Sequence, residues 1–100
     1  DKVGIVTDNV EGGDPYRLRI YDREGSPVFE KPFNYQYTGF DIDGDLVLLY
    51  NDSSCKVYNM TGTEKYNGTF DFTVSKVSAG RFPGTLLVMG PQKMTEIKLQ

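Results

Sequence analysis

A repeat with a spacing of 37 residues constrains the fold of this chain more than any other feature. The stretch IYDREGSPVFEKPF, residues 20–33, returns as VYNMTGTEKYNGTF, residues 57–70. The matched pairs, each 37 positions apart, are Tyr21 and Tyr58, Gly25 and Gly62, and Phe33 and Phe70. EIKLQ, at the C-terminus, is a partial third copy. Repeats of about 20–50 residues are typical of stacked structural units such as propeller blades.

The repeated unit has the residue pattern of β-strands and tight turns. YRLRIYD, residues 16–22, alternates apolar and polar side chains, as a half-buried strand does. DREG and NMTG then have Asp or Asn first and Gly last, which is typical of a type I turn. Pro27 and Pro32 cannot donate a backbone hydrogen bond, so SPVFEKPF is predicted to lie at a sheet edge. LVLLY, residues 46–50, is apolar on both faces and is predicted to be central.

These patterns predict an all-β fold of repeated four-stranded antiparallel meanders, equivalent to about two and a half β-propeller blades. We expect one β-propeller-like unit over residues 1–100, with a partial blade at 1–33, a blade at 34–72 and a partial blade at 73–100. The chain would open on a second strand, Lys2 to Asp8, and close on a third, Thr95 to Gln100. A β-sandwich, with the sheets of the two halves packed face to face, is the alternative.

Two and a half blades cannot close a ring, so apolar faces and strand edges would stay open. We therefore expect a fragment of a larger propeller protein that depends on further blades or forms a homo-oligomer through its open edges. The longest apolar run is far shorter than the ~18 residues that cross a bilayer. Because the sequence starts at Asp1 without Met, we expect membrane attachment only through an N-terminal anchor that precedes it.

The segments YRLRIYDREGSPVFEKPF, LVLLYNDSSCKVYNMTGTEKYNGTF and TEIKLQ resemble a bacterial, mainly clostridial family, number 5711 of the domains of unknown function. The resemblance covers essentially the whole chain. It implies the C-terminal part of a β-propeller-like extracytoplasmic domain in a single-pass membrane protein. The family has no assigned activity, so the resemblance implies no catalytic residue.

Composition argues against several classes of function. Without histidine, the chain lacks Ser–His catalysis and His-based metal sites. With one cysteine it has neither an intrachain disulfide nor a thiolate metal centre. A net charge of −3 lacks the basic footprint of a nucleic-acid binder. We therefore predict no catalytic, cofactor-binding or metal-binding residue, no cofactor and no nucleic-acid partner.

Acidic residues supply two candidate sites. DIDGD places Asp41, Asp43 and Asp45 at the spacing of a calcium loop, but the twelfth position is Asp52 rather than Glu. A plain Asp-Gly turn is therefore favoured over a calcium site. Glycoside hydrolysis needs two carboxylates across a cleft. The candidates, most of them in expected turns where solvated acids are typical, are Asp8, Glu11, Asp14, Asp22, Glu24 and Asp71.

Four further features have a structural and a functional interpretation. VEGGDP, residues 10–15, could bind an anion through backbone amides, but it lacks the P-loop lysine, and a flexible hairpin insertion is favoured. Cys55 is interpreted as a small strand residue, with Lys56 on the opposite face. The sequons at Asn51, Asn59 and Asn67 would be used only in a eukaryotic secreted protein, and turns explain them equally. The aromatic residues that could line a sugar or peptide surface, but whose spacing favours packing between sheets, are Tyr35, Tyr37, Tyr50, Tyr58, Tyr66 and Phe72.

We therefore predict a non-catalytic, extracytoplasmic interaction module whose partner is a protein or a cell-envelope component. The alternative is a carbohydrate-binding or hydrolytic propeller fragment, with its ligand in the central channel of a complete ring.

Overall fold

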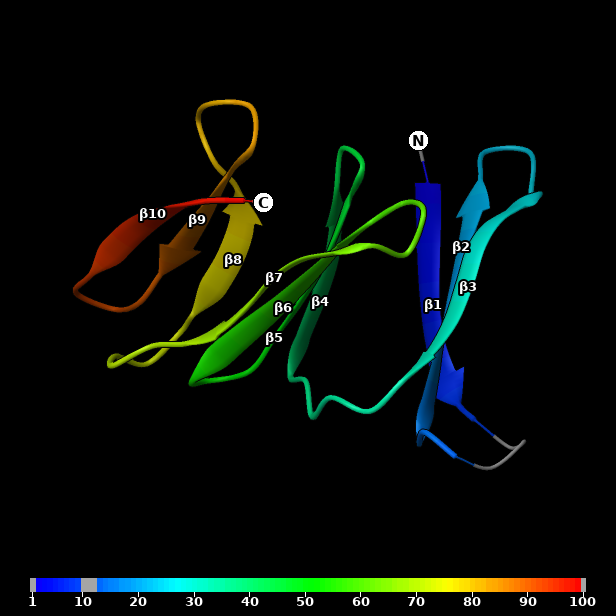
Figure 1. The fold of residues 1–100 in the computed structure, drawn as a ribbon, viewed down its shortest axis with the longest axis horizontal. Coiled ribbons are helices and arrows are strands. Elements are labelled where there is room, and N and C mark those ends of the chain that lie inside the picture. Colours follow the sequence, from blue (N-terminus) through cyan, green and yellow to red (C-terminus); the bar gives the residue numbers. More distant parts are fainter. Residues whose placement is uncertain (1, 10–12, 100) are drawn as a thin grey trace.

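Ten β-strands form three open antiparallel sheets in the computed structural model, which describes residues 2–9 and 13–99 (Figure 1). Sheet A comprises β1 (Lys2–Asp8), β2 (Tyr16–Asp22) and β3 (Pro27–Phe33). Sheet B comprises β4 (Gly39–Asp43), β5 (Leu46–Tyr50), β6 (Ser54–Asn59) and β7 (Glu64–Thr69). Sheet C comprises β8 (Lys76–Ala79), β9 (Thr85–Met89) and β10 (Met94–Lys98). Consecutive strands pair in each sheet, which confirms the all-β fold of antiparallel meanders.

The two copies of the repeat form the same turn. The Asp22 carboxylate accepts hydrogen bonds from the backbone N–H groups two and four residues later, at 3.0 and 2.9 Å. The Asn59 side-chain oxygen accepts the equivalent pair, also at 3.0 and 2.9 Å. Gly25 and Gly62 close these turns with φ of 83° and 87°, a region that favours glycine. The turn residues of the repeat thus have the same structural role in both copies.

The strand register repeats as well. The pairing of β2 with β3 shifts between Ile20 and Tyr21, and the pairing of β6 with β7 shifts between Val57 and Tyr58. Tyr21 and Tyr58 therefore occupy equivalent places in their sheets. This result confirms that the 37-residue spacing marks a structural repeat.

The predicted edge and central strands are also confirmed. β3, which contains both prolines, lies at the edge of sheet A, and β5 is flanked by β4 and β6. The last strand begins and ends earlier than expected, at Met94–Lys98 rather than Thr95–Gln100. Gln100 lies outside the described residues.

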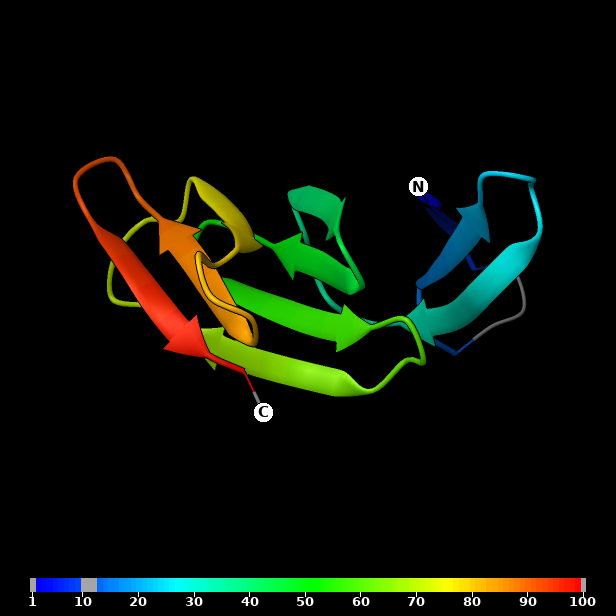
Figure 2. The ribbon, with the colours of Figure 1, turned by 90° about the horizontal axis from the view of Figure 1, so that it is seen from above.

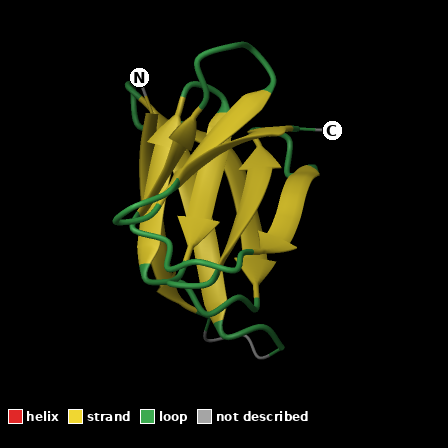
Figure 3. Ribbon diagram, turned by 90° about the vertical axis from the view of Figure 1, so that its left-hand side faces the viewer, coloured by secondary structure: helices red, strands yellow, loops and turns green. Residues whose placement is uncertain are grey.

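Sheet B is the middle layer of the stack because β5 buries side chains on both of its faces (Figures 2 and 3). Val47 and Leu49 face sheet A, whereas Leu48 faces sheet C, and all three are fully buried. Between A and B the buried residues are Leu18, Ile20, Phe33, Val47, Leu49 and Tyr58. Between B and C they are Leu48, Cys55, Val57, Val74, Val77, Leu86 and Val88. Three stacked sheets replace the two of the alternative sandwich. No helix within residues 2–9 and 13–99 is long and apolar enough to cross a membrane.

Gly90, at the end of β9, marks a close approach of two backbone segments. A Cβ atom there would lie 2.5 Å from the carbonyl oxygen of Thr73 and 2.8 Å from the Phe72 ring. The substitution Gly90→Ala should therefore force a backbone shift and destabilise the fold by about 2 kcal/mol. Chemical denaturation measures this effect. Gln92→Ala, in the exposed part of the same turn, is the control and should change stability by less than about 0.5 kcal/mol. Equal effects of the two substitutions would contradict the close approach.

Candidate functional site

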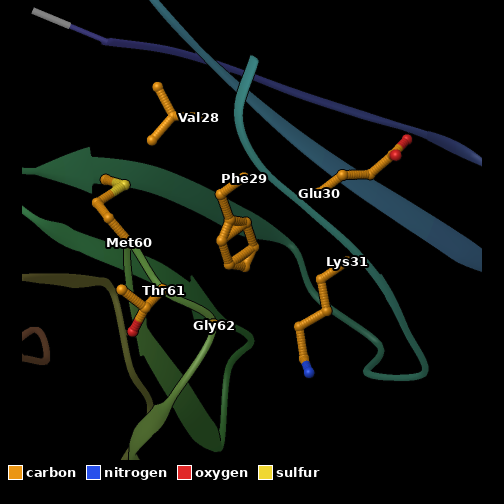
Figure 4. A pocket seen from close by; sticks show the side chains of 7 residues that line it. All are labelled: Val28, Phe29, Glu30, Lys31, Met60, Thr61 and Gly62. Atoms are coloured by element: carbon orange, nitrogen blue, oxygen red, sulfur yellow. The ribbon is translucent and has the colours of Figure 1, made fainter.

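A groove runs between β3 of sheet A and the turn that joins β6 to β7 in sheet B. It consists of two hollows of ≈ 340 and ≈ 350 Å³, which share Lys31 and Gly62. The first hollow, shown in Figure 4, is lined by Val28, Phe29, Glu30, Lys31, Met60, Thr61 and Gly62. The second is lined by Asp14, Lys31, Pro32, Phe33, Asn34, Lys56, Tyr58, Gly62 and Glu64.

The alternation of β3 decides which side chains enter the groove. Phe29 and Lys31 extend toward the β6–β7 turn, whereas the Glu30 carboxylate points away from them (Figure 4). Glu30 accepts a hydrogen bond from Arg19 Nε at 2.7 Å and lies 3.5 Å from a terminal nitrogen of Arg17. The hydrogen bond from Arg19 is the main reason why the pKa of the Glu30 carboxyl is lowered, and the charges of both arginines lower it further. The carboxylate is therefore held on the outer face of sheet A and does not neutralise the groove.

Gly62 lets the β6–β7 turn approach the aromatic ring of Phe29. A Cβ atom at Gly62 would lie 3.3 Å from Phe29 Cε2. The glycine thus serves two purposes, since its φ of 87° also closes the turn. Phe29 and Met60 supply the apolar part of a first hollow whose exposed lining is mostly polar, and both pack against the buried cluster between sheets A and B.

Two ammonium groups share the ring of Tyr58. Lys31 Nζ lies 5.3 Å and Lys56 Nζ 5.7 Å from the ring centroid, both within cation–π range. Lys56 also forms an ion pair with Glu64, at 3.7 Å. Within residues 2–9 and 13–99, by contrast, no carboxylate oxygen lies within 4 Å of Lys31 Nζ. Lys31 is therefore the cation of this groove that can bind an added anion.

The DIDGD segment forms a hairpin turn, as favoured from the sequence. Asp41 accepts a hydrogen bond from the next backbone N–H, at 2.8 Å. Asp43 accepts one from Ala79 N–H at 3.0 Å and so links the β4–β5 turn to sheet C. Gly44, with φ of 64°, completes the turn beside Asp45. Across the described residues, no three His, Cys, Asp or Glu side chains are grouped so that they could hold a metal ion.

The other acidic candidates lie at separate places. Asp8 ends β1, Asp22 ends β2, and Glu24 lies in the turn that follows β2. Asp71 follows β7 and pairs with Lys93 at 3.3 Å. Of the acidic candidates among residues 2–9 and 13–99, Asp14 alone lines the groove. Of the VEGGDP segment, Gly13 to Pro15 belong to the connection between β1 and β2; Val10, Glu11 and Gly12 lie outside the described residues.

The aromatic candidates divide between the two inter-sheet clusters. Tyr35, Tyr37 and Tyr58 belong to the cluster between A and B, and Tyr50, Tyr66 and Phe72 to the one between B and C. The packing interpretation is therefore confirmed. Burial raises the pKa of three of the tyrosines, Tyr35, Tyr37 and Tyr66. Of these six described candidates, Tyr58 is the one that lines the groove.

The turn interpretation holds for two of the three sequon asparagines. The Asn51 side-chain oxygen accepts hydrogen bonds from the N–H groups of Ser53 and Ser54 in the β5–β6 turn, and Asn59 forms the turn after β6. Asn67 instead lies within β7, so the turn explanation is wrong for this residue. Its exposed side chain follows from the position of β7 at the edge of sheet B.

The groove residues Phe29, Lys31 and Lys56 were not singled out as binding residues from the sequence. The alternation of β3 does place Phe29, Lys31 and Phe33 on one face. The sequence does not say that this face meets the Tyr58 side of the next sheet, because that contact depends on how the sheets stack.

Fold and groove together define an all-β protein of stacked antiparallel meanders with a half-open groove between two of its sheets. A family model matches residues 1–99, and the chain belongs to that family, a family of unknown function (DUF5711). Neither a curated protein nor a solved structure shows significant similarity to the chain.

Proposed function

We propose that this chain is a non-catalytic interaction module and that its sheets are blades of a β-propeller-like extracytoplasmic domain, anchored to the membrane in a larger protein. The propeller proposal is supported by the repeated strand order and by the stacking of successive sheets through their faces. The extracytoplasmic location and the anchor rest on the family resemblance.

The observation that carries the binding proposal is the Lys31 ammonium over the ring of Tyr58, beside the apolar side chains of Phe29 and Met60. Such a groove favours a ligand that combines a negative charge with apolar side chains. An extended acidic segment of a partner protein has this chemistry. Because successive side chains of such a segment point to opposite sides, an apolar residue and an acidic residue two positions apart could enter the groove together.

One observation favours the hydrolytic alternative, since two carboxylates, Asp14 and Glu64, line the second hollow. A general acid near neutral pH needs a raised pKa, which burial or a neighbouring carboxylate provides. Glu64 is exposed and forms an ion pair with Lys56, so it lies in a solvated setting rather than a buried one. We therefore propose binding rather than hydrolysis.

Titration with a short peptide of Val-Ser-Glu-Ser repeats, which places Val and Glu two positions apart on the same side, tests the proposal, with binding followed by NMR shifts of the groove amides. We expect weak binding that is lost at high salt, because the charges are partly exposed. Lys31→Gln should weaken binding about tenfold, a loss of ~1.4 kcal/mol that is typical of a hydrogen bond to a charged group. Lys76→Gln, on sheet C, is the matched control and should bind as the unaltered chain does.

A peptide with Gln in place of each Glu should bind the unaltered chain no more tightly than the acidic peptide binds the Lys31→Gln variant. Equal affinity of the unaltered chain and Lys31→Gln for the acidic peptide would reject the proposed site. A response to neutral oligosaccharides, with none to the acidic peptide, would support the carbohydrate alternative instead.

A further inference from the structure

The outer face of sheet A exposes a row of apolar side chains whose counterparts in sheet B are buried. Val3 and Ile5 in β1 are 57% and 44% exposed. Val3 pairs with Tyr21, as Val47 pairs with Tyr58, and Ile5 pairs with Arg19, as Leu49 pairs with Lys56. Val47 and Leu49 are fully buried because sheet A covers them. The outer face of sheet A is therefore equivalent to the face of sheet B that packs against sheet A.

Sheet C, at the other end of the stack, also has an outer face that no sheet among the described residues covers. Leu87 and Met89 alternate with the buried Leu86 and Val88, so they point away from sheet B, and Met94 pairs with Met89 and is 63% exposed. Leu87 is in the middle strand of sheet C and pairs with a residue in each neighbouring strand, as Leu48 does in sheet B. Leu48 is fully buried because sheet C covers it. The outer face of sheet C is therefore equivalent to the face of sheet B that packs against sheet C.

We infer that these two outer faces bind each other in a second copy of this chain, with sheet C of one copy stacked on sheet A of the next. The contact would continue the interfaces that already join A to B and B to C, with apolar side chains at equivalent positions. Because one face of the contact differs from the other, the association is head to tail and forms a ring or an open stack. In this assembly the other copies supply the further blades of the proposed propeller. The inference rests on the stacked sheets and not on the Lys31 groove, so it can fail independently of the proposed binding function.

Single substitutions can block one face at a time. Ile5→Glu places a carboxylate opposite Arg19 on sheet A, and Met89→Glu places one opposite Lys76 on sheet C. Each introduced charge therefore has a favourable cross-strand partner in the separate chain but would be desolvated in the stack. The association is measured by light scattering after size exclusion and by sedimentation velocity over a concentration series.

The unaltered chain should be larger than a monomer, with a mass that rises with concentration, and each variant alone should be monomeric. An equimolar mixture should form a 1:1 dimer and nothing larger, because it retains one intact A face and one intact C face. Phe82→Asp removes an apolar side chain that is 61% exposed in the β8–β9 loop and should associate as the unaltered chain does.

Circular dichroism must show that each variant is folded. Val3→Glu and Met94→Glu, on the same two faces, replace any variant that is not. A monomeric unaltered chain, a single variant that still associates fully, or a mixture of folded variants that stays monomeric would each overturn the inference.

Discussion

Replacing Leu48 with alanine is expected to lower the free energy of unfolding by about 3 kcal/mol. Leu48 is fully buried between sheets B and C, in contact with a cluster that includes Val57 and Val88. Truncation removes apolar contacts and leaves a cavity that rigid strands on both sides cannot close. Urea denaturation at low micromolar concentration measures the loss.

The matched control is Leu87→Ala, at the equivalent place in sheet C. Leu87 is partly exposed because no sheet in the single chain covers it, so its truncation should cost less than about 1 kcal/mol. Equal losses at the two positions would contradict the burial pattern. At concentrations where copies stack, the cost of Leu87→Ala should rise toward that of Leu48→Ala.

The thiol of Cys55 is expected to react roughly 1,000-fold more slowly with a disulfide reagent at pH 8 than the same thiol in unfolded chain. Burial raises the pKa of this thiol from 9.0 to about 12, and the thiolate is the reacting form. Absorbance of the released reagent measures the rate, with the chain in concentrated urea as the reference. A rate near that of the unfolded chain would show that Cys55 is accessible.

The pH dependence of this reaction has a defined sign. In the folded chain the rate should keep rising toward pH 12, whereas in the unfolded chain it should level off above about pH 9. The stability that the protonated thiol contributes is fully present below pH 9. It is lost as the pH rises toward 12, because the unfolded chain then releases the proton more readily than the folded chain does.

Much of the fold could be predicted from local sequence patterns. Alternation predicted the strands, the prolines predicted the edge position of β3, and apolar residues on both faces predicted the central position of β5. Turn residues at Asp22 and Asn59 predicted the hairpins, because their side chains accept backbone hydrogen bonds locally. Each of these predictions depends on interactions within a few residues or between neighbouring strands.

The groove could not be predicted in the same way. Lys31 and Tyr58 lie 27 positions apart, in different sheets, and meet only because sheet A stacks on sheet B. Stacking depends on the relative placement of two faces, which alternation does not specify. Acidic candidates such as Asp22 and Asp71 form a turn and an ion pair, whereas Lys31, the groove lysine without a carboxylate partner among the described residues, is one lysine in an edge strand.

Sheet B contributes to both buried clusters, whereas sheets A and C contribute to one each. Cooperativity between the two ends of the molecule must therefore pass through sheet B, as between neighbouring units of a linear repeat array. Damage confined to sheet A leaves the cluster between B and C intact, and the reverse holds for sheet C. Amide hydrogen exchange should accordingly be slowest in β5 and β6, whose opening exposes both clusters at once.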